Sequence, residues 1–336
     1  MLVATTKPSI AKLKSERVAK KTIQYIRQYK WGNVFAMIRN NYRDAKICTD
    51  NFNNKLVVIT GATSGIGLVT AHKYASMGAN LLCVNRSNEK SEKLKQDIET
   101  TYGVVCNYII ADLSSLEESF KVANELNTLT KPIDVLIHNA GVFLTKREIT
   151  PEGFEKVLAI HYLSSFVINF TLMDKLKSQQ KARIIMVGSE GHRFAAWGLN
   201  LNDLNWENHR YSGLGSYGSA KLAQLLSMLV FADYFKNTGV TINTMHPGAV
   251  KSESGKTNGW LYKWYKKNVI DRTLKTADCS ADALYYLGVS PEIEGKSGNF
   301  YNLTTLEEPA PPALDKDVAL ELWQKTLEMT GLSTKN

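Results

Sequence analysis

The sequence predicts an α/β protein with a doubly wound parallel sheet, because two features repeat along the chain from residue 55 onward. Short runs rich in Val, Ile and Leu alternate with longer helix-like segments, a pattern typical of a parallel sheet buried on both faces. Glycine-rich or polar motifs follow these runs, at the carboxyl ends of the strands, where this architecture binds its ligands. The expected fold is therefore a Rossmann fold.

The strands expected in this sheet are six, each followed by a helical segment, at residues 55–60, 80–85, 105–113, 134–141, 183–189 and 240–248. We assign them to one domain, residues 53–305. A basic, helical N-terminal extension, residues 1–52, precedes this domain, and a helical tail, residues 306–336, follows it.

One insertion, at about residues 249–275, interrupts the alternation after the last strand. It contains GWLYKWYKK, in which Trp260/Trp264 and Leu261/Tyr265 are pairs spaced four residues apart on one helical face. An aromatic flap beside the carboxyl end of a strand favours a substrate lid. A packed helix or a protein contact is the alternative interpretation.

The positive charge of the chain is concentrated at its N-terminus. The net charge is +9, yet residues 1–50 hold eleven Lys and Arg against three acidic residues, and the remaining 286 residues hold thirty against twenty-nine. A nucleic-acid-binding domain would need a basic face of its own, so nucleic acid is not an expected partner. Hydrophobic residues make up 44% and charged residues 22% of the chain, which is an ordinary globular composition.

The cysteines are scattered, with no Cys-x-x-Cys spacing and no histidine cluster beside them. This pattern suits a reducing compartment and predicts neither a disulfide framework nor a metal site. No apolar run reaches the ~18 residues that span a bilayer, and no long apolar segment follows the N-terminal charges as in a secretory signal. We therefore predict a cytoplasmic protein.

The N-terminal extension carries an amphipathic pattern. Val18, Thr22, Tyr25, Ile26 and Tyr29 fall on one helical face, with Lys and Arg elsewhere. One interpretation is a helix that packs on the main domain. The other is a helix that lies on a membrane surface, because a basic amphipathic helix can occupy the plane of the interface. In that case the protein would be peripheral to a membrane.

The motif TGATSGIG, residues 60–67, follows the first strand and opens a helix, and in this context a glycine-rich loop predicts dinucleotide binding. Gly61, Gly65 and Gly67 let the backbone turn tightly and approach a pyrophosphate. The helix N-terminus supplies N–H groups and a partial positive charge. The spacing is Gly-x-x-x-Gly-x-Gly rather than the usual Gly-x-Gly-x-x-Gly.

The end of the second strand predicts which dinucleotide binds. An acidic residue there would accept hydrogen bonds from the ribose 2′-hydroxyl of NAD, whereas an arginine would suit the 2′-phosphate of NADP. The sequence reads CVNRS, so Asn85 and Arg86 stand where the acid would be. The charge favours NADP(H) over NAD(H); the alternative is that Arg86 is a surface residue.

The motif SYGSAK places Tyr217 four residues before Lys221, but the same spacing occurs twice more, in the N-terminal extension and in the aromatic insertion. Spacing alone therefore predicts nothing. Only Tyr217 and Lys221 lie between the fifth and sixth strands, downstream of Ser189. Position rather than spacing makes this pair a candidate catalytic site.

Taken in order, these motifs resemble the short-chain dehydrogenase/reductase family over about residues 53–305: TGATSGIG, Asp112-Leu113 after the third strand, HNAG (138–141), Ser189, YGSAK and HPG (246–248). Within the family, SEGHRF and SPEIEGKSGNFY resemble the retinol dehydrogenases and the WW-domain-containing oxidoreductase, as does the long gap between Ser189 and Tyr217. No WW domain precedes the enzyme domain in this sequence.

The resemblance implies a role for each motif. Tyr217 would be the general acid/base, Lys221 the cation that stabilises its phenolate and binds the nicotinamide ribose, and Ser189 the donor to the substrate oxygen. Lowering a tyrosine pKa from 10 to near 7 requires roughly 4 kcal/mol of differential stabilisation, and neighbouring positive charges can supply much of it. The implied cofactor cleft comprises Gly61, Thr63, Ser64, Gly65, Ile66, Gly67, Arg86, Asp112, Leu113, Asn139, Ala140, Gly141, Tyr217, Lys221, Pro247, Gly248 and Ser252.

Two positions depart from the family pattern. The family commonly has two serines after the fifth strand, and this chain has Gly188-Ser189, which keeps the catalytic one. In AIHYLSSF, residues 159–166, His161 aligns with an asparagine that in related sequences orders a water for proton relay to the lysine. We expect His161 either to bond a backbone carbonyl, with the relay built otherwise, or to alter the relay, because histidine titrates near neutral pH; a shifted alignment is the third explanation.

The resemblance implies an NADP(H)-dependent oxidoreductase for a hydrophobic alcohol or carbonyl substrate, such as a retinoid, steroid or aldehyde. The usual oligomers of the family make a homo-oligomer an expected assembly. The rival interpretation is a nucleotide-sensing or scaffold protein on the same fold. Such proteins usually lose the tyrosine or the lysine, and this chain keeps both.

Overall fold

The sheet at the centre of the molecule follows the expected topology. The computed structural model describes residues 20–250 and 274–333. Its main sheet has eight strands in the order β10-β9-β6-β5-β4-β1-β2-β3, with bounds β1 (Leu56–Thr60), β2 (Asn80–Asn85), β3 (Cys106–Ile110), β4 (Val135–His138), β5 (Ala182–Val187), β6 (Val240–His246), β9 (Phe300–Asn302) and β10 (Thr305–Glu307). The first six are parallel and lie where the sequence predicts them, so the doubly wound α/β fold is confirmed.

The last two strands extend the sheet beyond the six that the sequence predicts. Strand β9 pairs in parallel with β6, and β10 pairs antiparallel with β9. Both have three residues, too short for a clear apolar run. A separate pair of two-residue strands, β7 (Ala249–Val250) and β8 (Leu274–Lys275), lies at the two ends of the predicted insertion. The aromatic residues of the predicted lid lie outside the described residues.

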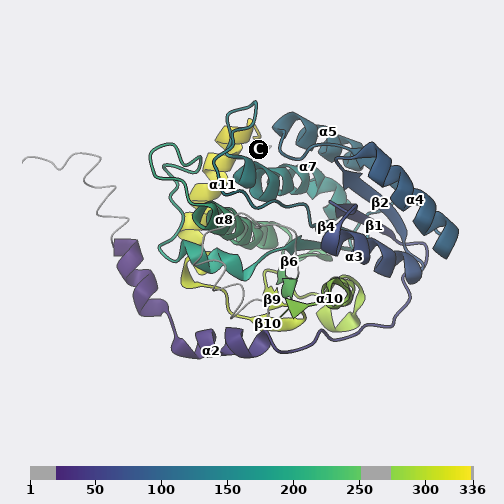
Figure 1. Cartoon of the computed structure of the whole chain (residues 1–336), viewed down its shortest axis with the longest axis horizontal. Coiled ribbons are helices and arrows are strands. Elements are labelled where there is room, and N and C mark those ends of the chain that lie inside the picture. Colours follow the sequence, from purple (N-terminus) through teal and green to yellow (C-terminus); the bar gives the residue numbers. More distant parts are fainter. Residues whose placement is uncertain (1–19, 251–273, 334–336) are drawn as a thin grey trace, which may run out of the picture.

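Helices cover both faces of the sheet (Figure 1). The helices that follow strands are α3 (Gly65–Ser76), α4 (Asn88–Tyr102), α5 (Leu116–Thr128), α7 (Ser164–Ser178), α8 (Gly213–Tyr234) and α10 (Ala277–Val289), and α11 (Lys316–Thr330) lies in the C-terminal tail. Helices α3, α4 and α10 pack on one face, and α5, α7, α8 and α11 on the other. Two apolar cores therefore bury the sheet on both sides, as its Val- and Ile-rich strands require.

Serine side chains cap the starts of two of the helices. The side chains of Ser87 and Ser115 accept hydrogen bonds from the amides of Lys90 and Glu118, which caps α4 and α5. Helix α4 ends at Gly103 in the left-handed conformation, with φ +67°, which glycine adopts without steric cost.

One long apolar helical stretch of the described residues is a core element. Lys156–Ser178 is long and apolar enough to cross a membrane by length and composition, but 78% of its apolar window is buried inside the domain. It contains α6 (Lys156–Leu158), the π-helical turn η1 (Ala159–Leu163) and α7. Phe166 packs its ring on Trp323 of α11. The stretch therefore belongs to the larger apolar core of the domain.

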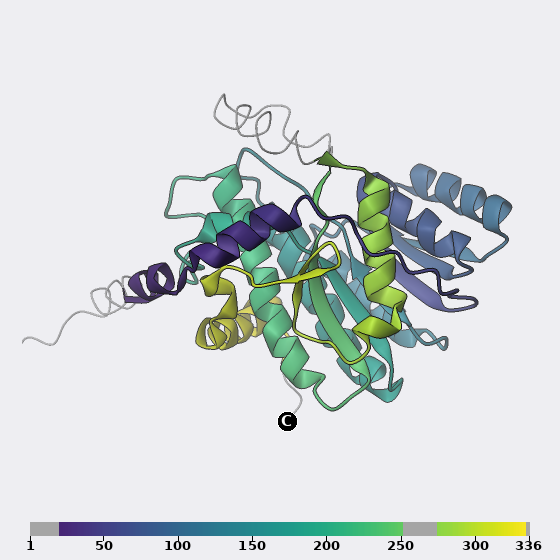
Figure 2. The same cartoon turned by 90° about the horizontal axis from the view of Figure 1, so that it is seen from below.

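The N-terminal extension is helical at residues 20–28 and in α2 (Trp31–Asn40), and it lies on the outside of the molecule in both views (Figures 1 and 2). Tyr25 is buried, its hydroxyl donates to Asp315 at 2.8 Å, and a Cβ on Gly198 would lie 2.8 Å from its ring. The first helix therefore packs on the domain through Tyr25. Ile26, assigned by the sequence pattern to the same face, is instead exposed.

Candidate active site

The glycine-rich loop after β1 is held by the HNAG segment after β4. The Thr60 hydroxyl accepts hydrogen bonds from the backbone N–H groups of Asn139 and Ala140, both at 3.0 Å. The Asn139 amide nitrogen donates to the carbonyls of Thr60 and Gly61 at 3.1 and 2.9 Å. A Cβ on Gly67 would lie 2.2 Å from the Gly61 carbonyl oxygen, so only glycine allows this close approach of helix and loop.

The start of α3 is open to a ligand. Ser64 precedes the helix, and its side chain makes no capping hydrogen bond, in contrast to the serines that cap α4 and α5. Gly65 has φ +55°, and a Cβ there would meet no atom within 4 Å. Ser64 and Gly65 are both exposed. Uncapped N–H groups beside open space form a cradle that fits a pyrophosphate.

The end of β2 separates the two residues that the sequence placed together. Asn85 is buried, and its side-chain oxygen accepts a hydrogen bond from the Ala62 amide at 2.7 Å, so it holds the glycine-rich loop. Arg86 is exposed and has no hydrogen bond or ion pair with any described residue. A guanidinium without an internal partner at this strand end is placed to bind a phosphate.

His161 lies against the HNAG segment rather than in solvent. Its ring is buried, and Nε2 is 2.8 Å from the carbonyl oxygen and 3.0 Å from the amide nitrogen of Val142. Its Nδ1 has no partner among the described atoms. Burial and the nearby Lys221 lower the pKa of His161 well below its usual value, so the ring is neutral at physiological pH.

The contacts of His161 therefore agree with the first two explanations for this residue, a structural histidine and an altered proton relay. Its Nε2 is satisfied by backbone, as the structural interpretation expects, and its Nδ1 is left to bond a water or ligand, as an altered relay requires. The ring centroids of His161 and Tyr217 are 5.3 Å apart and perpendicular.

Lys221 lies one turn after Tyr217 in α8 and is buried. Its Nζ donates to the Val187 carbonyl at 2.6 Å and to the side-chain oxygen of Gln224 at 3.1 Å, and it lies 5.8 Å from the centroid of the Tyr217 ring. Burial lowers the pKa of Lys221 to about 7. Gln224 could not be predicted from the sequence, because a glutamine three residues further along a helix is usually a surface residue.

Ser189 and Tyr217 meet around Gly191. A Cβ on Gly191 would lie 2.7 Å from Cε1 of Tyr217 and 3.1 Å from the Ser189 hydroxyl oxygen. Ser189 begins the short 3-10 helix η2 (Glu190–Ala195), and its hydroxyl accepts from the Gly191 amide at 2.9 Å. The segment after β5 thus places the serine beside the tyrosine, although twenty-eight residues separate them in sequence.

A buried histidine that sequence reasoning missed holds this segment. The Nδ1 of His192 lies 2.8 Å from the Ser189 carbonyl oxygen, and its Nε2 accepts from the Ala310 amide at 3.0 Å. Burial lowers the pKa of His192 to about 3, so one neutral tautomer serves both bonds. His192 therefore fixes the backbone of Ser189 to the C-terminal tail.

The remaining predicted cofactor residues follow strands β3 and β6, with one exception. Asp112 and Leu113 follow β3, and the Asp112 carboxylate accepts from the Ser114 amide at 2.9 Å. Pro247 and Gly248 follow β6, with Gly248 at φ +78°. Ser252 lies outside the described residues. The uncapped start of α3 and the exposed Arg86 guanidinium fit the phosphate groups of a dinucleotide.

Comparison with known proteins identifies the family. The profile of the short chain dehydrogenases matches residues 55–199. Human retinol dehydrogenase 13 is 31% identical over 286 residues, covering 83% of this chain and 85% of that protein. The zebrafish WW domain-containing oxidoreductase is 30% identical, covering 82% and 68% of the two chains. The protein therefore belongs to the short-chain dehydrogenase family, as its motifs predict, and resembles the retinol dehydrogenase branch.

A solved structure agrees on the fold. The crystal structure of a blue fluorescent protein from a metagenomic library, in complex with NADPH, superposes with a TM-score of 0.60 at 22% sequence identity. The match covers 75% of this chain and 97% of that one.

Proposed function

We propose that this protein is an NADP(H)-dependent oxidoreductase that transfers a hydride between nicotinamide and a hydrophobic alcohol or carbonyl compound, with Tyr217 as acid/base. The observation that carries the proposal is the convergence of Ser189, Tyr217 and Lys221: the first two meet around Gly191, and the Lys221 Nζ lies 5.8 Å from the Tyr217 ring centroid. Family membership supports the class of enzyme.

The cofactor is held, in this proposal, by two groups of the chain. The N–H groups at the start of α3 bind the pyrophosphate, and Arg86 binds the 2′-phosphate of NADP(H). When bound, the nicotinamide ring supplies or accepts the hydride. The NADPH complex of the similar blue fluorescent protein is consistent with this choice. NAD(H) is the less favoured cofactor, because no carboxylate stands at the end of β2.

The proton is moved by the side chains of the chain itself. The Tyr217 hydroxyl donates a proton to the alkoxide as it forms, and the Ser189 hydroxyl orients the substrate oxygen by a hydrogen bond. Lys221 stabilises the resulting phenolate when it is charged. Val187 and Gln224 hold its Nζ in place.

His161 completes the proposed relay. Its unpartnered Nδ1 would hold the water that an asparagine holds in related sequences. Because the ring is neutral, its Nδ1 can hydrogen-bond that water without placing a charge in the buried site.

The substrate class is supported by the aromatic residues around the tyrosine. The Phe143 ring centroid lies 5.7 Å from that of Tyr217. Phe194, in η2, is exposed, and its Cβ would be 3.0 Å from a Cβ on Gly218, the residue after Tyr217. Apolar rings beside the reacting tyrosine suit a retinoid-, steroid- or aldehyde-like compound. The retinol dehydrogenase relative is consistent with this class.

The proposal includes three further expectations from the sequence. The protein is cytoplasmic, it assembles as a homo-oligomer, and residues 1–50 contact a membrane surface peripherally.

The test is a substrate panel with the purified full-length protein. Retinal, a steroid ketone, a quinone and alkyl aldehydes are supplied with NADPH or with NADH at equal concentration, and oxidation of the cofactor is followed. We expect turnover of apolar carbonyls with NADPH and at most slow turnover with NADH. NADPH binding without oxidation across the whole panel would support a nucleotide-sensing protein instead, and a clear preference for NADH would overturn the role of Arg86.

A further inference from the structure

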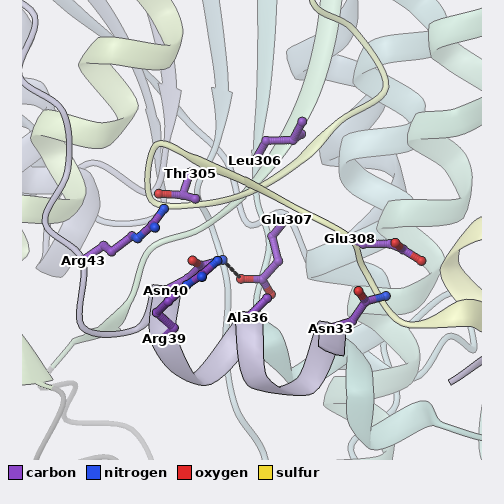
Figure 3. Close-up of a pocket in the computed structure, with 9 residues that line it drawn as sticks. All are labelled: Asn33, Ala36, Arg39, Asn40, Arg43, Thr305, Leu306, Glu307 and Glu308. Carbon is purple, nitrogen blue, oxygen red and sulfur yellow. Dashed lines mark hydrogen bonds between the residues drawn. The ribbon is translucent and has the colours of Figure 1, made fainter. Parts of the chain in front are cut away.

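A buried carboxylate at the edge of the sheet joins four elements of the fold. Glu307 ends β10, and its side chain is 1% exposed. One of its oxygens accepts hydrogen bonds from the amide of Asn40 in α2 at 2.8 Å, shown in Figure 3, and from the amide of Asn302 in β9 at 3.3 Å. The other oxygen accepts from Arg193 of η2 at 3.0 Å. Glu307 therefore connects the segment after Ser189 to the N-terminal extension and to the last two strands.

Arg193 extends this connection to Glu190, the residue that follows Ser189. Its Nε donates to the Glu190 carboxylate at 2.5 Å, and the backbone N–H of Glu190 donates to Nδ1 of His246 in β6 at 3.4 Å. Both the side chain and the backbone of Glu190 are thus held by neighbouring groups. The contacts of Glu190 therefore help to set the position of Ser189 in the candidate active site.

Glu190 and Glu307 share one buried cation. Their carboxyl groups lie within hydrogen-bonding reach of each other, and Arg193, whose side chain is 15% exposed, pairs with both. Two histidines beside them add no positive charge, because burial lowers the pKa of His192 to about 3 and that of His246 to about 4. One cation balances one carboxylate, so the second carboxyl group favours its protonated form.

The other ionisable groups around this pair are uncharged or lie in solvent. Tyr29 lies near Arg193, and burial raises the pKa of its hydroxyl, so it stays neutral. Three exposed charged side chains line a cavity of about 170 Å³ between α2 and β10: Arg39, Arg43 and Glu308. Water screens the charges of these three side chains. The balance of charge at the pair is therefore set mainly by its own two carboxyl groups and Arg193.

The Glu190 oxygen Oε1 is the atom that needs a proton nearby. It is buried and has no hydrogen-bond donor among the described atoms, which is costly for an ionised oxygen. Burial, and after it the charge of Glu190, raises the pKa of Glu307 to about 7. A proton between the two carboxyl groups supplies the missing donor, whereas its loss leaves two like charges in contact.

We propose that Glu307 is a positioning residue for Ser189 and acts through a proton that it shares with Glu190. This role rests on the proposed function, in which Ser189 orients the substrate oxygen. With the proton in place, Glu190 and Arg193 are fixed, and the turn after β5 holds Ser189 beside Tyr217. Without the proton, repulsion between the two carboxylates loosens that turn.

The experiment measures KM and kcat of the full-length protein from pH 6 to pH 8, with saturating NADPH and a carbonyl that wild type reduces. We expect the wild-type KM for the carbonyl to rise by up to about tenfold over this range. The reason is that the protonated fraction of a group with a pKa of about 7 falls from about nine-tenths to about one-tenth.

Three variants separate the shared proton from a merely structural role. Glu190→Gln places an amide donor where Oε1 lies, so its KM should stay near the low-pH value of wild type at every pH, with kcat unchanged. Glu307→Ala removes the partner of Arg193, so its KM should be high at every pH. Glu308→Gln removes the exposed carboxylate of the next residue and, as the matched control, should keep the wild-type profile.

Two further measurements need no turnover. The backbone amides of residues 188–196 should exchange hydrogen faster in wild type than in Glu190→Gln at pH 8, and at equal rates at pH 6. The melting temperature of wild type should fall relative to that of Glu190→Gln as the pH rises from 5 to 8. Between 4.5 and about 7 the folded chain holds a proton that the unfolded chain has lost. Lys221 titrates in both proteins and cancels in this comparison.

Two results would overturn the proposal. One is a KM with the same pH profile in wild type and in Glu190→Gln. The other is equal hydrogen exchange and a constant difference in melting temperature for these two proteins at every pH. If Glu307→Ala does not fold, this comparison still decides. Exchange and melting use no substrate, so a protein that reduces no carbonyl would refute the proposed oxidoreductase and still leave the shared proton to be tested.

Discussion

The ring of His161 occupies the space that a side chain at position 141 would need: a Cβ on Gly141 would lie 2.3 Å from Cε1 of His161. The two residues come from segments twenty positions apart, HNAG after β4 and the π-helical turn η1. This contact explains why a histidine larger than the family's asparagine fits beside the HNAG motif, and it yields the first prediction.

Gly141→Ala should destabilise the protein by about 1–3 kcal/mol, because the buried imidazole cannot move away without strain. Urea unfolding measures the loss. His161→Ala opens the space that the new methyl group needs, so the double variant should lose less than the sum of the two single variants. Additive losses would show that the two residues do not compete for this space.

The burial of Lys221 predicts a pH dependence of stability without ligand. Its folded pKa is about 7, against 10.5 for the free side chain, so between these values the unfolded chain binds a proton that the folded chain does not. The free energy of unfolding should therefore rise with pH across this range. From pH 7 to 9, wild type should gain about 2 kcal/mol relative to Lys221→Met. Parallel stability profiles of the two proteins would contradict the burial of an ionisable group.

The exposed Arg86 predicts cofactor selectivity. Arg86→Ala should weaken NADPH binding by about tenfold or more and leave NADH binding nearly unchanged, because only the 2′-phosphate loses its partner. Fluorescence titration with both cofactors measures the ratio. Lys90→Ala, in the first turn of α4, removes an exposed cation nearby and serves as the matched control. An equal effect of the two substitutions would show that Arg86 acts only through its positive charge and is not a specific partner of the 2′-phosphate.

His192 predicts that Ser189 is positioned through its backbone. His192→Asn can keep one of the two hydrogen bonds, whereas His192→Leu removes both. We expect turnover to fall in the order wild type, Asn, Leu, with NADPH binding unchanged, because in the proposed mechanism Ser189 orients the substrate rather than the cofactor. If both variants lost NADPH binding along with turnover, His192 would be a general structural residue.

Strands β1 to β6 could be predicted from the sequence because continuous runs such as LVVIT and ARIIMV have one structural explanation, a strand buried on both faces. Once these strands were assigned, the ligand-binding motifs could be placed at their carboxyl ends. Position relative to the strands was enough to predict one site that contains Ser189, Tyr217 and Lys221. The structure brings these three residues together.

The sequence could not predict hydrogen bonds between residues that meet only in the folded protein. The sequence predicts Asn85 at the cofactor-selecting position, yet its buried side chain accepts a hydrogen bond from the Ala62 amide. Asn40 and Glu307 are 267 residues apart, and no local pattern predicts their bond.

The proposed role of Tyr217 as proton donor is tested most directly by the turnover of Tyr217→Phe. With a carbonyl that wild type reduces, the variant should lose at least about a thousandfold in kcat, while its affinity for NADPH changes little because the ring and Lys221 remain. Tyr234→Phe, at the far end of the same helix, should keep full activity. A Tyr217→Phe protein that retains most of its turnover would contradict the role of this tyrosine as the proton donor.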